Sequence, residues 1–196
     1  MVWTVCAMLM AVATIDSQSL YPGFLVFIST LLIMLLLVSL MGGNWRVTLQ
    51  TRACDVKWLG LAVALAVIYW QLDHWFFMWL DADQMTTSQQ QWHINQAAYL
   101  SWSVFAGTVV LAPLVEEVFF RGLLFNTLQV HFRAHWVIAL SAGFFALIHP
   151  SWPLVVSVFL AGMMYGWLRY RAGSVLPAVL AHFIHNAMTF WLYAGV

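Results

Sequence analysis

The feature that most constrains this chain is a set of apolar runs about as long as a bilayer is thick. A helix needs roughly 20 apolar residues to cross the hydrocarbon core, and such runs lie near residues 20–42, 58–80, 152–168 and 174–195. With 64% hydrophobic residues, 7% charged residues and a mean hydropathy of +0.87, a water-soluble fold is nearly excluded. We therefore expect an all-α fold, a polytopic transmembrane helical bundle.

Two shorter apolar runs complete the bundle. Residues 1–15 lack the Lys or Arg that begins a secretory signal, so we expect an uncleaved first helix rather than a targeting peptide. Residues 135–150 lie between Arg133 and the helix-ending Pro150, which leaves room for one tilted crossing. With a further helix over 99–131, argued below, the sequence predicts about seven spans.

The basic residues predict the orientation. Alternating spans put six of them on one side, which the positive-inside rule assigns to the cytoplasm: Arg46, Arg52, Lys57, Arg133, Arg169 and Arg171. The N-terminus is then cytoplasmic, and we expect a bacterial inner (cytoplasmic) membrane. Without an internal repeat or a linker, residues 1–196 form one integral membrane domain in the bilayer. Seven Lys and Arg balance seven Asp and Glu, which argues against a nucleic-acid partner.

One cluster of charges interrupts an apolar run. Glu116, Glu117 and Arg121 lie within six consecutive positions, and a charge in hydrocarbon is tolerated mainly when it is paired or lines a wet cavity. On a helix, Glu117 and Arg121 are four residues apart and share a face, which suits an ion pair. Glu116 points about 100° away and is left available for chemistry.

Further polar groups fall in the apolar runs that follow. His149 ends one run, while His182 and Asn186 are four apart on another. His185 lies one position off that pair and is expected to pack or bond elsewhere. A carboxylate, imidazoles and an amide that converge in a membrane could activate a water and stabilise an oxyanion. They could equally hold a divalent metal.

The depth of these groups predicts a long helix. If the helix before Glu116 ended at residue 115, Glu116 would lie at the cytoplasmic edge and His149 near the outer edge. A helix over 99–131, roughly 50 Å long, would have to tilt, bend at Pro113 or protrude, and it brings Glu116 to mid-membrane. His182 then lies about 12 Å deep by the same rise per residue, so the polar side chains of the different helices could meet within the membrane.

Three short motifs, or boxes, lie in order along the chain at 116–121, 145–149 and 182–186. They resemble those of the CPBP family of intramembrane proteases, which includes CaaX prenyl endopeptidases and bacteriocin-processing or immunity (Abi-type) proteins. The resemblance covers roughly residues 110–190, within a protease core of about 97–196. The boxes read Glu116-Glu117-Val-Phe-Phe-Arg121, Phe145-Ala-Leu-Ile-His149 and His182-Phe-Ile-His185-Asn186.

The resemblance implies a glutamic endopeptidase that cuts a membrane-embedded, membrane-anchored or lipid-modified peptide. Glu116 would be the general base on a water that His149 helps to position, and Glu117 and Arg121 would be the structural pair that fixes the helix. His182 and Asn186 would stabilise the oxyanion.

Several alternatives stay open. The family has also been described as metal-dependent, and Glu116, His149 and His182 could ligate zinc; we favour no cofactor, because Asn186 is a good oxyanion donor and an unusual zinc ligand. A non-catalytic immunity or binding protein of the same fold is a second possibility. A proton or ion carrier is a third, although the repeats common in transporters are missing. Asp73 and His74 are expected at the interface or in an interhelical bond.

Overall fold

The computed structural model describes residues 32, 50–80, 105–149 and 152–194, and every regular element in these ranges is helical. The all-α prediction is therefore confirmed for this part of the chain. The helices predicted over 1–15 and 20–42 lie outside it, apart from Leu32. The total of seven spans and the cytoplasmic N-terminus consequently stay predictions.

Four long helices appear close to the predicted runs. Their bounds are α4 (Val56–Trp79), α10 (Ala134–Leu147), α11 (Trp152–Ala172) and α12 (Leu176–Ala194). Among the described residues, α4 and α11 are the two helices long and apolar enough to cross a membrane, and α10 is a shorter apolar helix. The apolar runs thus predict these helices to within a few residues.

Asp55 begins α4. Its side chain accepts a hydrogen bond from the backbone N–H of Lys57 at 3.0 Å, which satisfies one of the free donors of the first turn. The ammonium of Lys57 lies 2.9 Å from the same carboxylate. These bonds hold the pKa of Asp55 below its usual value, so the cap stays ionised at neutral pH.

A continuous helical stretch occupies 105–129, inside the predicted helix over 99–131. It changes type along its length, in the order η2 (Phe105–Leu111), α8 (Ala112–Glu117), η3 (Val118–Leu124) and α9 (Phe125–Gln129). The segments η2 and η3 are π-helical, a form that is rare and often found at functional sites. Pro113, which has no N–H, lies at the start of α8 directly after η2. Glu116 and Glu117 therefore lie where an α-helical turn gives way to a π-helical one.

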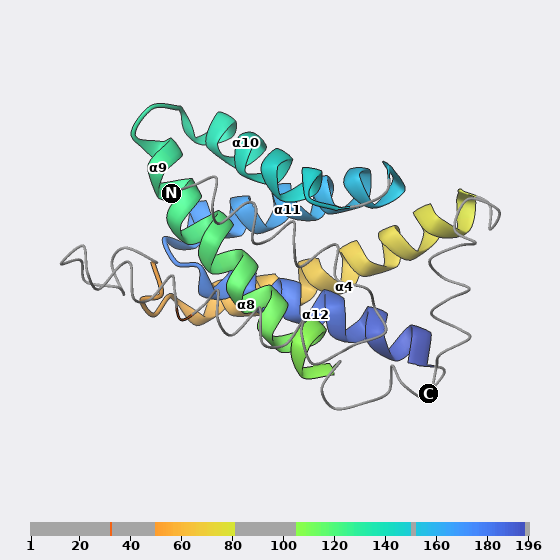
Figure 1. The fold of residues 1–196 in the computed structure, drawn as a ribbon. Helices are drawn as coiled ribbons and strands as arrows, with labels where there is room; N and C mark the ends of the chain where they lie inside the picture. Colours follow the sequence, from red (N-terminus) through yellow and green to blue (C-terminus); the bar gives the residue numbers. More distant parts are fainter. Residues whose placement is uncertain (1–31, 33–49, 81–104, 150–151, 195–196) are drawn as a thin grey trace.

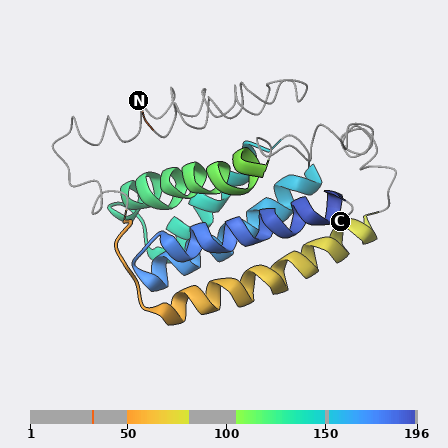
Figure 2. The ribbon, with the colours of Figure 1, turned by 90° about the horizontal axis from the view of Figure 1, so that it is seen from below.

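Helix α12 lies at the centre of this arrangement. It contacts α4, α11, α8 and η2, and Figures 1 and 2 show it between α4 on one side and the 105–129 stretch on the other. Helix α10 packs along α11. Side chains from α8, α11 and α12 can therefore meet inside the bundle.

Small residues set the closest approach of α10 and α11. A Cβ atom at Gly162 would lie 3.0 Å from Ala142 Cβ, and one at Gly166 would lie 3.2 Å from Ile138 Cγ2. Gly162 and Gly166 form a G-x-x-x-G pattern, which in membrane helices lets two backbones approach. The pattern does not show which helix is its partner, so the sequence alone does not predict the α10–α11 contact.

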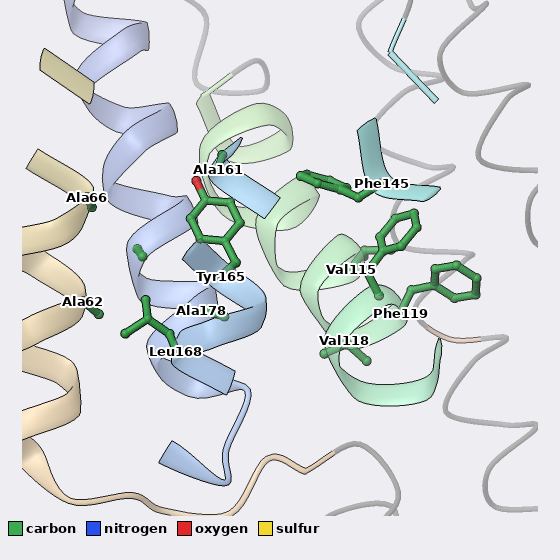
Figure 3. Close-up of a cluster of buried hydrophobic side chains, with 12 residues drawn as sticks. Ala62, Ala66, Val115, Val118, Phe119, Phe145, Ala161, Tyr165, Leu168 and Ala178 are labelled. Atoms are coloured by element: carbon green, nitrogen blue, oxygen red, sulfur yellow. The ribbon is translucent and has the colours of Figure 1, made fainter. Parts of the chain in front are cut away.

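The core combines small residues of α4 with larger ones from the other helices (Figure 3). Ala62 and Ala66 of α4 are fully buried, whereas the large apolar residues of α4 point outward, among them Val63, Val67, Ile68, Leu72, Trp75 and Met78. Small residues inside and large apolar ones outside are typical of a helix that meets lipid on its outer face. Tyr165 lies in the middle of the cluster and is 1% exposed.

The turn between α11 and α12 is tied to the chain that precedes α4. Gly173 has φ of 64° and donates its N–H to the Arg169 carbonyl at 3.1 Å, which closes α11. Ser174 then donates its hydroxyl to the carbonyl of Arg52 at 2.6 Å, and the N–H of Val175 reaches the Gln50 carbonyl at 2.9 Å. These bonds fix the start of α12.

Candidate active site

Glu117 is the most enclosed carboxylate among the described residues. Its side chain is fully buried at the end of α8, and its Oε1 atom accepts from Arg121 Nη1 at 2.8 Å. The ion pair predicted from the four-residue spacing is therefore present. The same oxygen lies 3.0 Å from Nδ1 of His182, a contact between distant helices that the spacing did not predict.

Arg121 is held from several sides. Its Nη2 atom donates to the Gly162 carbonyl at 3.1 Å, and its guanidinium carbon lies 4.5 Å from the ring centroid of Phe145 and 5.4 Å from that of Tyr165. The side chain has no solvent exposure. Aromatic faces attract a cation, so the charge is balanced by Glu117 and by two rings.

His182 of α12 lies between the two glutamates. Its Nδ1 atom faces Glu117, and its Nε2 atom is 3.8 Å from Oε2 of Glu116. Because the carboxylate of Glu117 can only accept, Nδ1 carries a proton and Nε2 is the atom presented to Glu116. The ring stacks on Tyr165 with centroids 5.0 Å apart and planes at 16°.

Glu116 differs from its neighbour in both exposure and partners. Its side chain is 15% exposed, against 0% for Glu117. Within the described part of the chain it forms no hydrogen bond, and its ion-pair partner is His182. Among the described residues, Glu116 therefore has both oxygens free of hydrogen bonds, whereas Oε1 of Glu117 is engaged by Arg121 and His182.

His149 reaches this cluster through Phe145. It lies just beyond α10, and its Nδ1 atom bonds the Phe145 carbonyl at 3.0 Å. The Phe145 ring contacts both imidazoles, with centroids 5.3 Å from His149 and 5.7 Å from His182. Since a carbonyl only accepts, Nδ1 of His149 carries the proton, and Nε2 of the neutral ring is an acceptor.

Asn186 lies one helical turn beyond His182 on α12. Its amide nitrogen donates to the carbonyl of Thr108 in η2 at 2.9 Å. An amide group has two N–H donors, so one remains for another acceptor. The structure thus joins Glu116, Glu117, Arg121 and His182 in one network, brings His149 in through a shared ring, and holds Asn186 at η2.

The zinc alternative stays a prediction. Among the described residues, no three His, Cys, Asp or Glu side chains are grouped so that they could hold a metal ion. His182 and His149 each use Nδ1 for a hydrogen bond, to Glu117 and to a backbone carbonyl, so Nε2 is the atom of each ring that could ligate a metal.

A second polar cluster adjoins the first. His185 Nε2 lies 3.4 Å from Asp73 Oδ2, which is the kind of interhelical bond expected for Asp73. His74 instead stacks on Trp70 within α4. Sequence reasoning missed Tyr165, which touches both clusters, because its spacing does not distinguish it from the other aromatic residues of α11.

One known protein family matches the part of the chain that holds this site. Residues 97–188 match the family model described as Rce1-like: Type II CAAX prenyl endopeptidase Rce1-like. No curated protein and no solved structure matches the chain. The matched segment contains all three boxes, from Glu116 to Asn186. Members of the family are integral membrane proteins and CAAX-type intramembrane endopeptidases, and the apolar helices α4 and α11 fit that setting. Over residues 97–188, this chain therefore carries an Rce1-like domain of the CPBP family.

Proposed function

We propose that this protein is a glutamic intramembrane endopeptidase of a bacterial inner membrane, in which Glu116 activates a water to cut a membrane-anchored or lipid-modified peptide. The difference between the two adjacent glutamates carries the proposal. Glu117 is fully buried and bonded to Arg121 and His182, whereas Glu116 is partly exposed and faces an imidazole 3.8 Å away. A general base needs a free oxygen that a water can reach, and Glu116 meets this requirement.

The attack begins between Glu116 and His182. A separation of 3.8 Å between Oε2 and Nε2 is too long for a direct hydrogen bond, but both atoms can bond one water. Glu116 takes a proton from that water as its oxygen bonds to the scissile carbonyl carbon. The Nε2 acceptor of His149 can hold the second hydrogen of the water and so orient its lone pair.

The tetrahedral intermediate then carries a negative oxygen. In this mechanism His182 is protonated at both ring nitrogens from the outset: Nδ1 donates to Glu117, and Nε2 donates first to the water and then to this oxygen. Asn186 donates with the N–H that Thr108 does not use. Such donors are worth about 2.7–4 kcal/mol each in other acyl-transfer enzymes. The C–N bond breaks as Glu116 returns its proton to the leaving nitrogen, which restores the carboxylate.

The test compares purified wild type with Glu116→Gln in lipid, on a panel of membrane-anchored peptides that includes prenylated ones. The substitution keeps shape but removes the base, so cleavage should fall by about 10²–10⁴-fold while peptide binding persists. Glu117→Gln is the matched control for stability: it breaks a buried pair and should melt lower, whereas Glu116→Gln should melt like wild type.

Each arm has an outcome that contradicts the proposal. Wild-type cleavage by Glu116→Gln would remove Glu116 from the chemistry. Cleavage lost with a strong chelator and restored by zinc would make Glu116, His149 and His182 metal ligands instead of water-activating groups. Peptide binding without cleavage of any panel member by wild type would replace the protease with a binding or immunity protein of the same fold.

A further inference from the structure

Three polar side chains outside the proposed chemistry form a line through the bundle. Asp73 on α4 lies 3.4 Å from His185 Nε2 on α12, and His185 Nδ1 lies 3.3 Å from the hydroxyl of Tyr165 on α11. The side chains of Asp73 and His185 are 14% and 13% exposed, and Tyr165 is 1% exposed. Asp73 precedes the matched family segment, so the line joins that segment to a helix outside it.

Tyr165, the last member of this line, contacts the candidate active site. The ring of Tyr165 stacks on His182 at 5.0 Å and 16°, and it also lies 5.4 Å from the guanidinium of Arg121. The hydrogen bond between the Tyr165 hydroxyl and His185 fixes the far end of the ring that stacks on His182. Figure 3 shows Tyr165 between the helices, among the buried apolar side chains.

Asp73 is itself anchored at both oxygens. Ser157 donates its hydroxyl to Oδ1 while Oδ2 faces His185. Ser157 is fixed in turn, because Tyr69 donates its hydroxyl to the Ser157 carbonyl at 2.6 Å. A carboxylate in an apolar helix costs free energy, and this one is oriented toward a single imidazole.

We propose that Asp73, His185 and Tyr165 are positioning residues that hold the ring of His182 in register with Glu116. The inference rests on the proposed function, which gives His182 its task. Asp73 orients His185, His185 fixes the hydroxyl of Tyr165, and the Tyr165 ring sets the plane of His182. A displacement of about 1 Å in a reacting group can cost about a hundredfold in rate, so this support acts on kcat.

The kinetic test uses Asp73→Leu and Tyr165→Phe. The first removes the charge, and the second removes the hydroxyl but keeps the stacked ring. Each should lower kcat about 10–100-fold with KM unchanged. Because the residues act in series, the double variant should lose little more than one single variant, whereas independent effects would multiply.

The matched control is Trp58→Phe. Trp58 lies at the opposite end of α4 from Asp73, and its ring packs edge-on against Trp167 of α11 with centroids 6.1 Å apart. The substitution therefore weakens the packing of α4 on α11 away from the line, and its kcat should equal that of wild type. An equal loss of kcat in Trp58→Phe and Asp73→Leu would overturn the inference and leave only helix packing.

An NMR measurement tests the same link without turnover. In protein labelled with ¹⁵N in its histidine rings and held in lipid, the His182 signals are identified by their loss in His182→Gln. Asp73→Leu and Tyr165→Phe should shift these signals, and Trp58→Phe should not. Unshifted His182 signals in Asp73→Leu would refute the link.

The two proposals fail in different ways. If Glu116→Gln is inactive while Asp73→Leu has wild-type kcat and His182 signals, the positioning line is wrong and the protease stands. If Glu116→Gln cleaves like wild type, the proposed function is wrong. The NMR shifts then still decide whether Asp73 acts on His182.

Discussion

The close approach of α10 and α11 at Gly162 gives a sharp prediction about Gly162→Ala. The added Cβ would meet Ala142 Cβ at 3.0 Å, the Ala142 Cα at 3.1 Å and Arg121 Nη2 at 3.1 Å. Neither Ala142 atom can rotate away, because one belongs to the backbone and the other is attached to it. The backbone of α10 or α11 must therefore move, and Arg121 with it.

The magnitude follows from two opposing terms. Alanine in a helix interior is favoured over glycine by about 0.5–1 kcal/mol, while overpacking a filled contact costs about 1–3 kcal/mol. Gly143→Ala is the matched control on α10, since its Cβ would meet nothing within 4 Å. The helix preference cancels between the two variants, so Gly162→Ala should be less stable than Gly143→Ala by about 1–3 kcal/mol.

Thermal melting in detergent measures this difference. For a chain of this size, 1 kcal/mol corresponds to about 2–4 °C in Tm. Gly162→Ala should therefore melt several degrees below Gly143→Ala, and Gly143→Ala at or slightly above wild type. If Gly162→Ala melts with or above the control, then α10 and α11 do not pack as closely as described, and the reasoning fails.

Two other substitutions test the Glu117–Arg121 ion pair and the turn at Gly173. Arg121→Met leaves Glu117 buried without its cation and should destabilise the protein by about 3–5 kcal/mol. Adding Glu117→Gln should recover part of that loss. An Arg121→Met protein that melts like wild type would contradict a structural pair. Gly173→Ala places a side chain at φ of 64° and should cost about 1–2 kcal/mol, seen as an earlier midpoint in SDS titration; an unchanged midpoint would count against the strained turn.

The length of the apolar runs was enough to predict the main helices. The runs at 58–80, 135–150, 152–168 and 174–195 each coincide with one helix to within four residues at either end, because a lipid-facing helix must be apolar over most of its length. The π-helical segments η2 and η3 were not predictable. Their apolar residues have no spacing that separates a π-helical turn from an α-helical one, so only the packed structure shows them.

The sequence predicted contacts between site residues of one helix, but not contacts between residues of different helices. Spacing alone pairs Glu117 with Arg121, because both belong to one stretch. It does not show which way the face of α12 turns, and that rotation gives His182 its place between two glutamates. For the same reason Asp73 could be expected to bond another helix, whereas its link through His185 to Tyr165 could not.

The bonds from Ser174 and Val175 back to Arg52 and Gln50 also imply an order in which the helices assemble during synthesis. Ser174 is made 122 residues after Arg52, so residues 50–52 and α4 are in place long before α12 can dock on them. His182 and Asn186 both arrive with α12. The proposed active site is therefore incomplete until that helix has inserted.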